Sequence, residues 1–146
     1  MRVFDLIVRP AVPGDSADIR EICGTGLGYD CEEELVNRRL ENIGQGDAVF
    51  VAETNGKAVG FVHAECYRCL YFEDALNILG LAVLPEYRRN GIGRMLMDAV
   101  EDHARIHGIA VIRLNSGASR TGAHAFYRSI GYDNEKDQIR FLKYLN

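Results

Sequence analysis

Two glycines, Gly91 and Gly93, stand between a strongly apolar stretch and the start of an amphipathic helix. The first backbone N–H groups of a helix have no partner within it, and the helix dipole favours negative charge at that end. Glycines let the main chain approach a ligand without a side chain in the way. The segment from Arg88 to Arg94 therefore predicts a bound phosphate or pyrophosphate.

This loop differs from two common phosphate-binding motifs. A dinucleotide fingerprint reads G-x-G-x-x-G, whereas Gly93 is followed here by Arg94 and Met95. A P-loop requires Gly-Lys-Ser/Thr, which this sequence lacks. The remaining alternative is a glycine turn that only packs a helix on a sheet. Arg88 and Arg89 could add positive charge, or could be two solvated arginines on a turn.

A second block, Ser119–Tyr127 with Gly131-Tyr132, follows this loop. Arg88-x-x-Gly91-x-Gly93 is similar to the Q/R-x-x-G-x-G/A signature of the GNAT superfamily of acyl-CoA N-acyltransferases, and the second block stands at the distance usual in that family. Motif-level similarity covers about Leu76 to Tyr132, and the order of elements agrees over nearly the whole chain. The chain thus resembles a single-domain N-acetyltransferase.

The resemblance implies acetyl-CoA as the co-substrate, with its pyrophosphate on main-chain N–H groups of the glycine loop. The pantetheine arm would lie beside the strand that ends at Val83, and the N–H of Leu81 would polarise the acetyl carbonyl. The cofactor-binding residues implied in this way are Leu81, Ala82, Val83, Arg88, Arg89, Asn90, Gly91, Ile92, Gly93, Arg94, Asn115 and Ser119.

The implied reaction is direct attack of a neutral primary amine on the thioester within a ternary complex. Tyr127 occupies the family's tyrosine position, and a phenol is protonated at neutral pH and can donate to a leaving thiolate. The structural alternative is a half-buried tyrosine on the apolar face of a short helix. Relatives often carry a glutamate on the central strand, where this chain has Asn77. Glu65, Glu73 and Asp74 are near enough in sequence to act as the general base, directly or through water, and Glu65 is the candidate chosen. The alternative for each is a surface acid.

The acceptor is expected to be a small-molecule or peptide amine. Its binding site should lie between the first two helices and the hairpin region, with Tyr29, Asp30, Tyr67 and Tyr71 as wall residues. The competing hypothesis is a catalytically silent acyl-CoA-binding sensor or subunit. The missing strand glutamate favours that alternative, and the retained Tyr127 opposes it.

Composition narrows the class of protein. The chain has 146 residues, of which 47% are hydrophobic and 26% charged, with a formal net charge of −4. The negative charge argues against nucleic acid as a partner, because nucleic-acid binders present a basic face. Apolar runs are too short to span a membrane, and the first residues do not resemble a signal peptide, so we expect a cytoplasmic protein. A homodimer is expected from base rates alone.

No metal is expected. Cys66 and Cys69 have the spacing of zinc ligands, but they fall in or near an alternating strand, where an offset of three points side chains to opposite faces. His103 and His107 are spaced i, i+4 on a helix, and no third ligand is evident.

The hydrophobic patterns predict one α/β domain over residues 1–146. The resemblance implies a GNAT-like mixed central sheet of about six to seven strands, with splayed parallel central strands and about four flanking helices. Asn55-Gly56 is a two-residue hairpin signal, and Gly24–Tyr29 is expected to be a flexible connection. The expected strands cover about 4–9, 49–53, 58–67, 76–84, 109–114 and 139–145. The expected helices cover about 15–24 and 31–43, a long helix from Ile92 that Gly108 ends, and a short one that Gly131 ends.

Overall fold

A computed structural model describes residues 5–134 and 136–146. It divides into two compact units, one reaching to Arg113 and the other covering Leu114–Asn146. The strands are β1 (Ile7–Pro10), β2 (Ala48–Thr54), β3 (Lys57–Tyr67), β4 (Ala75–Val83) and β5 (Val111–Leu114). The α-helices are α1 (Ser16–Ile22), α2 (Glu33–Glu41), α3 (Ile92–Ile106) and α4 (Thr121–Ser129), and short helical turns are η1 (Pro13–Asp15), η2 (Cys23–Leu27) and η3 (Pro85–Tyr87).

The sheet has the order β1-β2-β3-β4-β5, and the pairs β1–β2, β2–β3 and β3–β4 are antiparallel. Asn55 and Gly56 both have positive φ, 51° and 75°, as a tight hairpin turn between β2 and β3 requires. The helical crossover from β4 to β5 is the connection that parallel neighbours need. The predicted mixed α/β class is confirmed, and the described residues form fewer strands than the six to seven expected. The splaying of the parallel strands stays a prediction.

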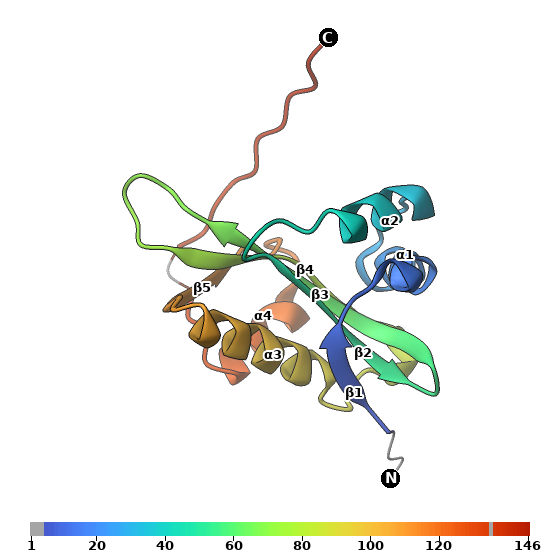
Figure 1. Cartoon of the computed structure of the whole chain (residues 1–146). Helices are drawn as coiled ribbons and strands as arrows, with labels where there is room; N and C mark the ends of the chain where they lie inside the picture. Colours follow the sequence, from blue (N-terminus) through green and yellow to red (C-terminus); the bar gives the residue numbers. More distant parts are fainter. Residues whose placement is uncertain (1–4, 135) are drawn as a thin grey trace. The chain divides into compact units, whose positions relative to one another are not determined.

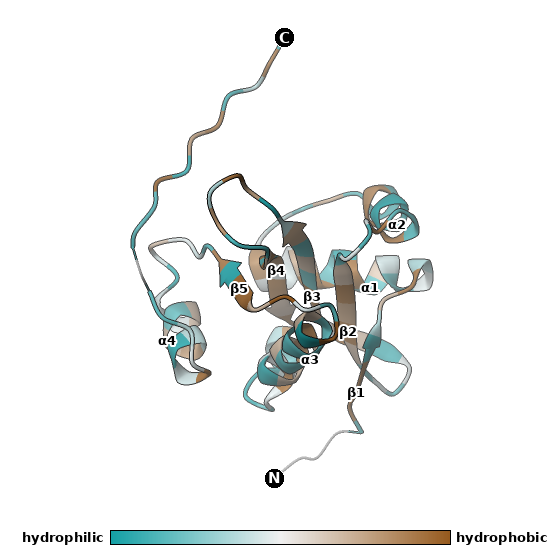
Figure 2. Ribbon diagram, turned by 60° about the vertical axis from the view of Figure 1, so that its left-hand side comes forward, coloured by the Kyte–Doolittle hydropathy of each residue, from teal (hydrophilic) through white to brown (hydrophobic). Residues whose placement is uncertain are grey.

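Helices cover both faces of the sheet in the first unit. α1 and α2 lie on one side and α3 on the other (Figure 1). α1 packs on β3 and against α2, whereas α3 packs on β2, β3 and β4. Figure 2 shows that apolar residues concentrate in β2, β3 and β4 between these helices. Strands with apolar residues on both faces are expected for a sheet covered on both sides.

The long helix α3 packs on the sheet through its buried residues Leu96, Met97 and Val100, at the three- and four-residue spacing of one helix face. Gly60 on β3 lets the helix come close. A Cβ there would lie 3.1 Å from Cγ2 of Ile92, which is tighter than ordinary van der Waals contact. Close packing of α3 on β3 therefore fixes the position at which the helix starts after the loop.

The segment Gly24–Tyr29, predicted as a flexible connection, is mostly the π-helical turn η2. A Cβ on Gly26 would lie 3.2 Å from the Cβ of Ala82, so glycine here lets the turn approach β4. The prediction was wrong because glycine was interpreted as a source of flexibility, whereas Gly26 allows η2 to pack closely against β4.

The first strand is shorter than predicted and extends one residue further, to Pro10. Phe4, where that strand was expected to begin, lies outside the described residues. Pro10 pairs with Phe50 as part of β1, the edge strand of the sheet. Proline lacks an N–H donor, which an edge strand tolerates.

The strand predicted over residues 139–145 is absent from the described chain, where this segment has no regular secondary structure. Its apolar side chains are exposed, with Phe141 at 89% and Tyr144 at 87%. Alternation predicts which side chains share a face of a strand, but a strand also needs a neighbour to pair with. The prediction was wrong because the alternation was taken as sufficient.

Asp15 is the main buried charge of the first unit. Its carboxylate accepts hydrogen bonds from Nη1 and Nη2 of Arg9, at 2.9 and 2.8 Å, and from the N–H of Val12 at 2.8 Å. Arg9 also donates to Glu53 at 2.8 Å. The guanidinium of Arg9 is the largest cause of the lowered pKa of Asp15. This network ties β1 and β2 to the start of α1.

We expect Asp15→Asn to lower the free energy of unfolding at pH 7 by about 2–3 kcal/mol, because it leaves Arg9 without its best-buried charged partner. Since folding lowers the pKa of Asp15 below 3.8, this stability is present above that pH and is lost as the pH falls through the lower, folded-state value. Urea unfolding at several pH values measures both effects.

Glu53→Gln is the matched control, because it removes the more exposed acid of the same network. A loss for Asp15→Asn no larger than that for Glu53→Gln would contradict this description of the network.

Candidate functional site

The chain turns sharply between β4 and α3. After Val83 it passes through η3, and Arg89 then takes a left-handed conformation with φ 64°. Gly91 follows with φ 76° and is the N-cap of α3. Two left-handed residues so close together reverse the chain at the sheet end, and the second of them is a glycine because other residues adopt this region at a cost.

The start of α3 is open. No side chain caps it, and a Cβ on Gly91 would meet nothing within 4 Å. Gly91 is therefore required by its backbone conformation, and it also leaves free space in front of the helix start. Ile92 is buried and contributes to the loop only through its backbone. Unpaired N–H groups facing open space make a geometry suited to an anion.

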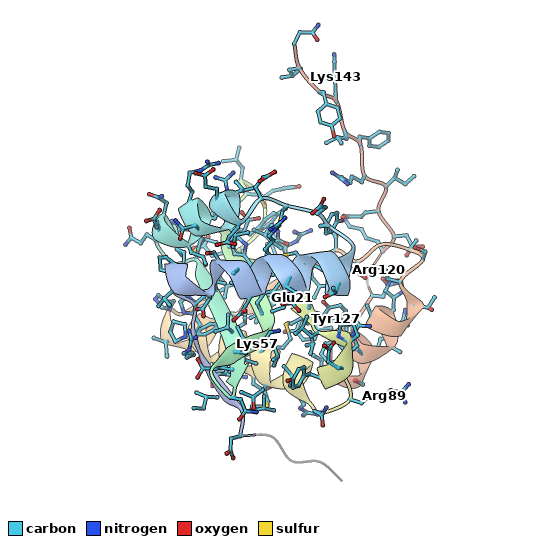
Figure 3. All side chains as sticks on the ribbon, turned by 90° about the vertical axis from the view of Figure 1, so that its right-hand side faces the viewer. Glu21, Lys57, Arg89, Arg120, Tyr127 and Lys143 are labelled. Carbon is cyan, nitrogen blue, oxygen red and sulfur yellow. The ribbon has the colours of Figure 1, made fainter. Side chains whose placement is uncertain are left out.

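Three polar side chains of the loop differ in what they do. Arg88 donates to the backbone carbonyls of Val83, at 3.3 Å, and Gly26, at 3.4 Å, so it ties the loop to β4 and η2. Asn90 donates to the carbonyls of Tyr87 and Arg88 at 3.0 Å each. Arg89 is exposed and its side chain projects away from the protein (Figure 3). Arg88 and Asn90 thus shape the loop, whereas Arg89 leaves its charge free at its edge.

A β-bulge interrupts β4 just before the strand end. His63 of β3 pairs with Gly80, but the next residue, Ala64, pairs with Ile78, so Leu79 is an extra residue on β4. Bulges bend a strand and turn its side chains and backbone groups away from the regular ladder. The bulge lies directly before Leu81, Ala82 and Val83, the strand end at which pantetheine binding was predicted.

Four side chains from three strands form a network. Asn77 donates through Nδ2 to Oε2 of Glu65 at 2.9 Å, and its Oδ1 accepts from Nη1 of Arg113 at 2.7 Å. The guanidinium of Arg113 lies over the ring of Tyr67, 4.4 Å from its centroid. Glu65 and Tyr67 alternate on β3 and so share one face of the sheet.

This face is the one that α1 covers further along β3. Gly60, on the opposite face, approaches Ile92 and Leu96 of α3. The face of Glu65 and Tyr67 therefore lies on the side of α1 and α2 (Figure 1). At the start of β3, Lys57 pairs with Glu21 of α1 at 3.2 Å (Figure 3). The network includes two residues predicted for the site, Glu65 and Tyr67, and joins them to Asn77 and Arg113.

His63 lies on the same face, two residues before Glu65. Burial is the main cause of its lowered pKa, with Asp47 and Glu65 opposing the shift and Arg39 adding to it. The imidazole is therefore neutral at pH 7 and can accept a proton.

His63 and Arg113 were missed from the sequence. A signal existed for Arg113, because it is the charged residue in the otherwise apolar run Val111–Leu114. A half-buried arginine inside a strand calls for a partner, and Asn77 and Tyr67 are two of its partners. His63 carried no comparable signal, since its place on the sheet face depends on the register of β3.

The other predicted acceptor residues stand apart from this network. Tyr29 and Asp30 are exposed in the connection between η2 and α2. Tyr71 is 81% exposed in the loop that joins β3 to β4. Their proposed role as walls of an acceptor site stays a prediction.

Three predicted residues belong to the second unit. Asn115 and Ser119 are exposed and follow β5, and Tyr127 is half-buried on α4. The ring of Tyr127 contacts Phe126 and Tyr132 edge-on, with centroids 5.2 and 6.1 Å away. Burial raises the pKa of Tyr127, with Arg120 opposing the shift, so the phenol is protonated at neutral pH.

Residues 5–134 and 136–146 contain no cluster of three or more His, Cys, Asp or Glu side chains placed to hold a metal ion. Within the same ranges no helix is both long and apolar enough to cross a membrane.

The model of the Acetyltransferase (GNAT) family matches residues 17–132, which include the loop before α3 and all of α4. The chain belongs to the GNAT family. The resemblance inferred from the two sequence motifs is thus confirmed.

Curated relatives of this GNAT protein are named N-acetyltransferases. An uncharacterised N-acetyltransferase of Chlorobaculum tepidum is 32% identical over 136 residues, which cover 90% of this chain and 78% of the relative. One from Methanocaldococcus jannaschii is 33% identical over 64% of this chain, but the match spans only 42% of the relative. The [ribosomal protein bS18]-alanine N-acetyltransferase of Escherichia coli is 30% identical, over 63% of this chain and 59% of the relative.

Solved structures share the fold. The aminoglycoside acetyltransferase AAC(6')-Iy, solved with a CoA-containing bisubstrate analogue, has a TM-score of 0.82 and 18% identity, and the match covers 96% of this chain and 99% of that one. A putative acetyltransferase from Agrobacterium tumefaciens has a TM-score of 0.82 and 22% identity, over 94% of this chain and 99% of the other. Identities this low support the fold and leave the acceptor open.

Proposed function

We propose that this GNAT protein transfers the acetyl group of acetyl-CoA to a primary amine by direct attack within a ternary complex. The observation that carries the proposal is the open start of α3, where Gly91 is left-handed and no side chain caps the helix. The curated relatives named N-acetyltransferases support the same activity.

In this proposal the pyrophosphate lies on the N–H groups of the loop from Arg88 to Arg94. The exposed Arg89 adds positive charge at its edge, while Arg88 and Asn90 hold the loop in shape. The pantetheine arm pairs with backbone groups of β4 beyond the bulge, from Leu81 to Val83, in the manner of an added strand. Asn115 and Ser119 contribute further contacts.

The chemistry requires two proton transfers. The amine nitrogen attacks the thioester carbonyl carbon, the N–H of Leu81 stabilises the oxyanion, and collapse forms the amide and breaks the C–S bond. The nitrogen becomes positively charged on attack and loses a proton to a base. Glu65 and the neutral His63, two residues apart on one face of β3, are the candidates for this base. Tyr127 gives a proton to the thiolate, and the raised pKa of this phenol keeps that proton available.

The alternative is a catalytically silent acyl-CoA-binding sensor or subunit. It is favoured by one observation, the presence of Asn77 where relatives often carry a glutamate. The amide of Asn77 cannot accept a proton at neutral pH, but it binds the carboxylate of Glu65 at 2.9 Å. The carboxylate of Glu65 is therefore hydrogen-bonded to the side chain at the strand position where relatives often carry a glutamate. A carboxylate close to that position favours the active enzyme over the silent one.

Turnover separates the two functions. The assay incubates the protein with acetyl-CoA and a panel of amines, including amino acids, peptides and an aminoglycoside, and measures free thiol released. Acceptor-dependent thiol release supports the transferase. Saturable acetyl-CoA binding without release above the hydrolytic background for every acceptor would favour the sensor. Whether the protein is a homodimer stays a prediction, which sedimentation of the same preparation tests.

Gly91→Asp should weaken acetyl-CoA binding at least about tenfold, because it adds bulk and negative charge where the pyrophosphate is proposed to lie. Calorimetric titration with acetyl-CoA measures the change. Gly56→Asp is a closely matched control, since Gly56 has φ 75° and, like Gly91, no atom within 4 Å of an added Cβ. Equal affinities of the two variants would reject the loop as the pyrophosphate site.

Tyr127→Phe should lower kcat by about tenfold to a hundredfold and leave acetyl-CoA affinity nearly unchanged, because it removes a proton donor and little bulk. Since burial raises the pKa of Tyr127, the wild-type kcat should persist into alkaline pH and fall only above the ordinary phenol value of 10.0. Tyr144→Phe, at an exposed tyrosine, is the control. An unchanged kcat for Tyr127→Phe would exclude this phenol as the acid.

A further inference from the structure

Arg113 and Glu65 carry opposite charges on neighbouring parts of one sheet face but do not pair directly. Among the described residues no ion pair within 4.0 Å joins them. The amide of Asn77 stands between them and binds both, at 2.7 and 2.9 Å. The guanidinium of Arg113 and the carboxylate of Glu65 are therefore roughly 7 Å apart, the length of two hydrogen bonds with one amide group between them.

Both charged groups retain unused bonding capacity. A guanidinium has five N–H donors, and in the described part of the chain Arg113 uses one of them in a side-chain hydrogen bond. A carboxylate accepts up to about four hydrogen bonds, and Glu65 accepts one there. Both side chains are half-buried, so an incoming charged group would gain more from them than from fully solvated side chains.

The guanidinium is held in a fixed orientation. Its carbon lies 4.4 Å from the centroid of the Tyr67 ring, and Nη1 is fixed by Asn77. A guanidinium that lies over an aromatic ring still has N–H donors at its edge, and these donors match the two oxygens of a carboxylate. Little side-chain entropy remains to be lost when such a ligand binds.

We propose that Arg113 binds the carboxylate of the amine acceptor while Glu65 faces its ammonium group, so that the acceptor is an amino acid. The inference rests on the proposed acetyl transfer and names its substrate class. The gap of roughly 7 Å between the charges of Arg113 and Glu65 fits an α-amino acid that forms one hydrogen bond to the protein through its carboxylate and one through its ammonium group. Asn77 positions both charged side chains and keeps them from neutralising each other.

The test compares each amino acid with its own carboxamide, which keeps the amine and loses the negative charge. Arg113→Gln should raise KM at least tenfold for the acid and leave KM for the carboxamide and the affinity for acetyl-CoA within about twofold. Arg113→Lys should recover part of the loss, because it restores the charge without the planar fork. Arg68→Gln is the matched control, since Arg68 is exposed and pairs with Asp74 at 3.6 Å, outside the network.

Three results would overturn the inference: wild-type protein that uses carboxamides as well as acids, equal losses for both acceptors in a folded Arg113→Gln variant, or turnover restricted to amines without a carboxylate. Calorimetric titration of the wild type with amino acids alone tests the site without any turnover, and absence of binding there also counts against it. Loss of the proposed function is recognised separately, by a failure to bind acetyl-CoA.

Discussion

The reversal of the chain between β4 and α3 is the constraint on which the rest of the molecule depends. Gly60 lets Ile92 and Leu96 pack closely on β3, and this fixes the start of the helix beside the strand end. The left-handed Gly91 then completes the turn and leaves the first N–H groups of α3 without a capping side chain. The same packing that buries the helix therefore leaves exposed the helix start at which the pyrophosphate is proposed to bind.

The sheet contributes a second feature through its irregularity. A regular β4 would place Leu79 and Leu81 on one face, but the bulge at Leu79 shifts the register by one residue. Asn77 remains opposite Glu65, before the bulge, while Gly80 pairs with His63 beyond it. One extra residue thus separates the strand end assigned to the cofactor from the polar network assigned to the acceptor.

Short-range sequence patterns predicted correctly those elements that depend only on neighbouring residues. The Asn55-Gly56 turn, the apolar strand β4 and the amphipathic α3 all follow from short-range pattern. Features that depend on distant partners could not be predicted. The network of Asn77 and Arg113 requires cross-strand register, and the alternating segment 139–145 forms no strand among the described residues, because alternation alone supplies no neighbour.

The central claim is that the start of α3 binds the pyrophosphate of acetyl-CoA, and calorimetric titration of the wild-type protein tests it most directly. Acetyl-CoA is titrated first, and ATP and NAD follow under the same conditions, because they carry phosphates without the pantetheine arm. We expect saturable binding of acetyl-CoA and no saturable binding of ATP or NAD. Absence of acetyl-CoA binding, or equal binding of all three ligands, would contradict it.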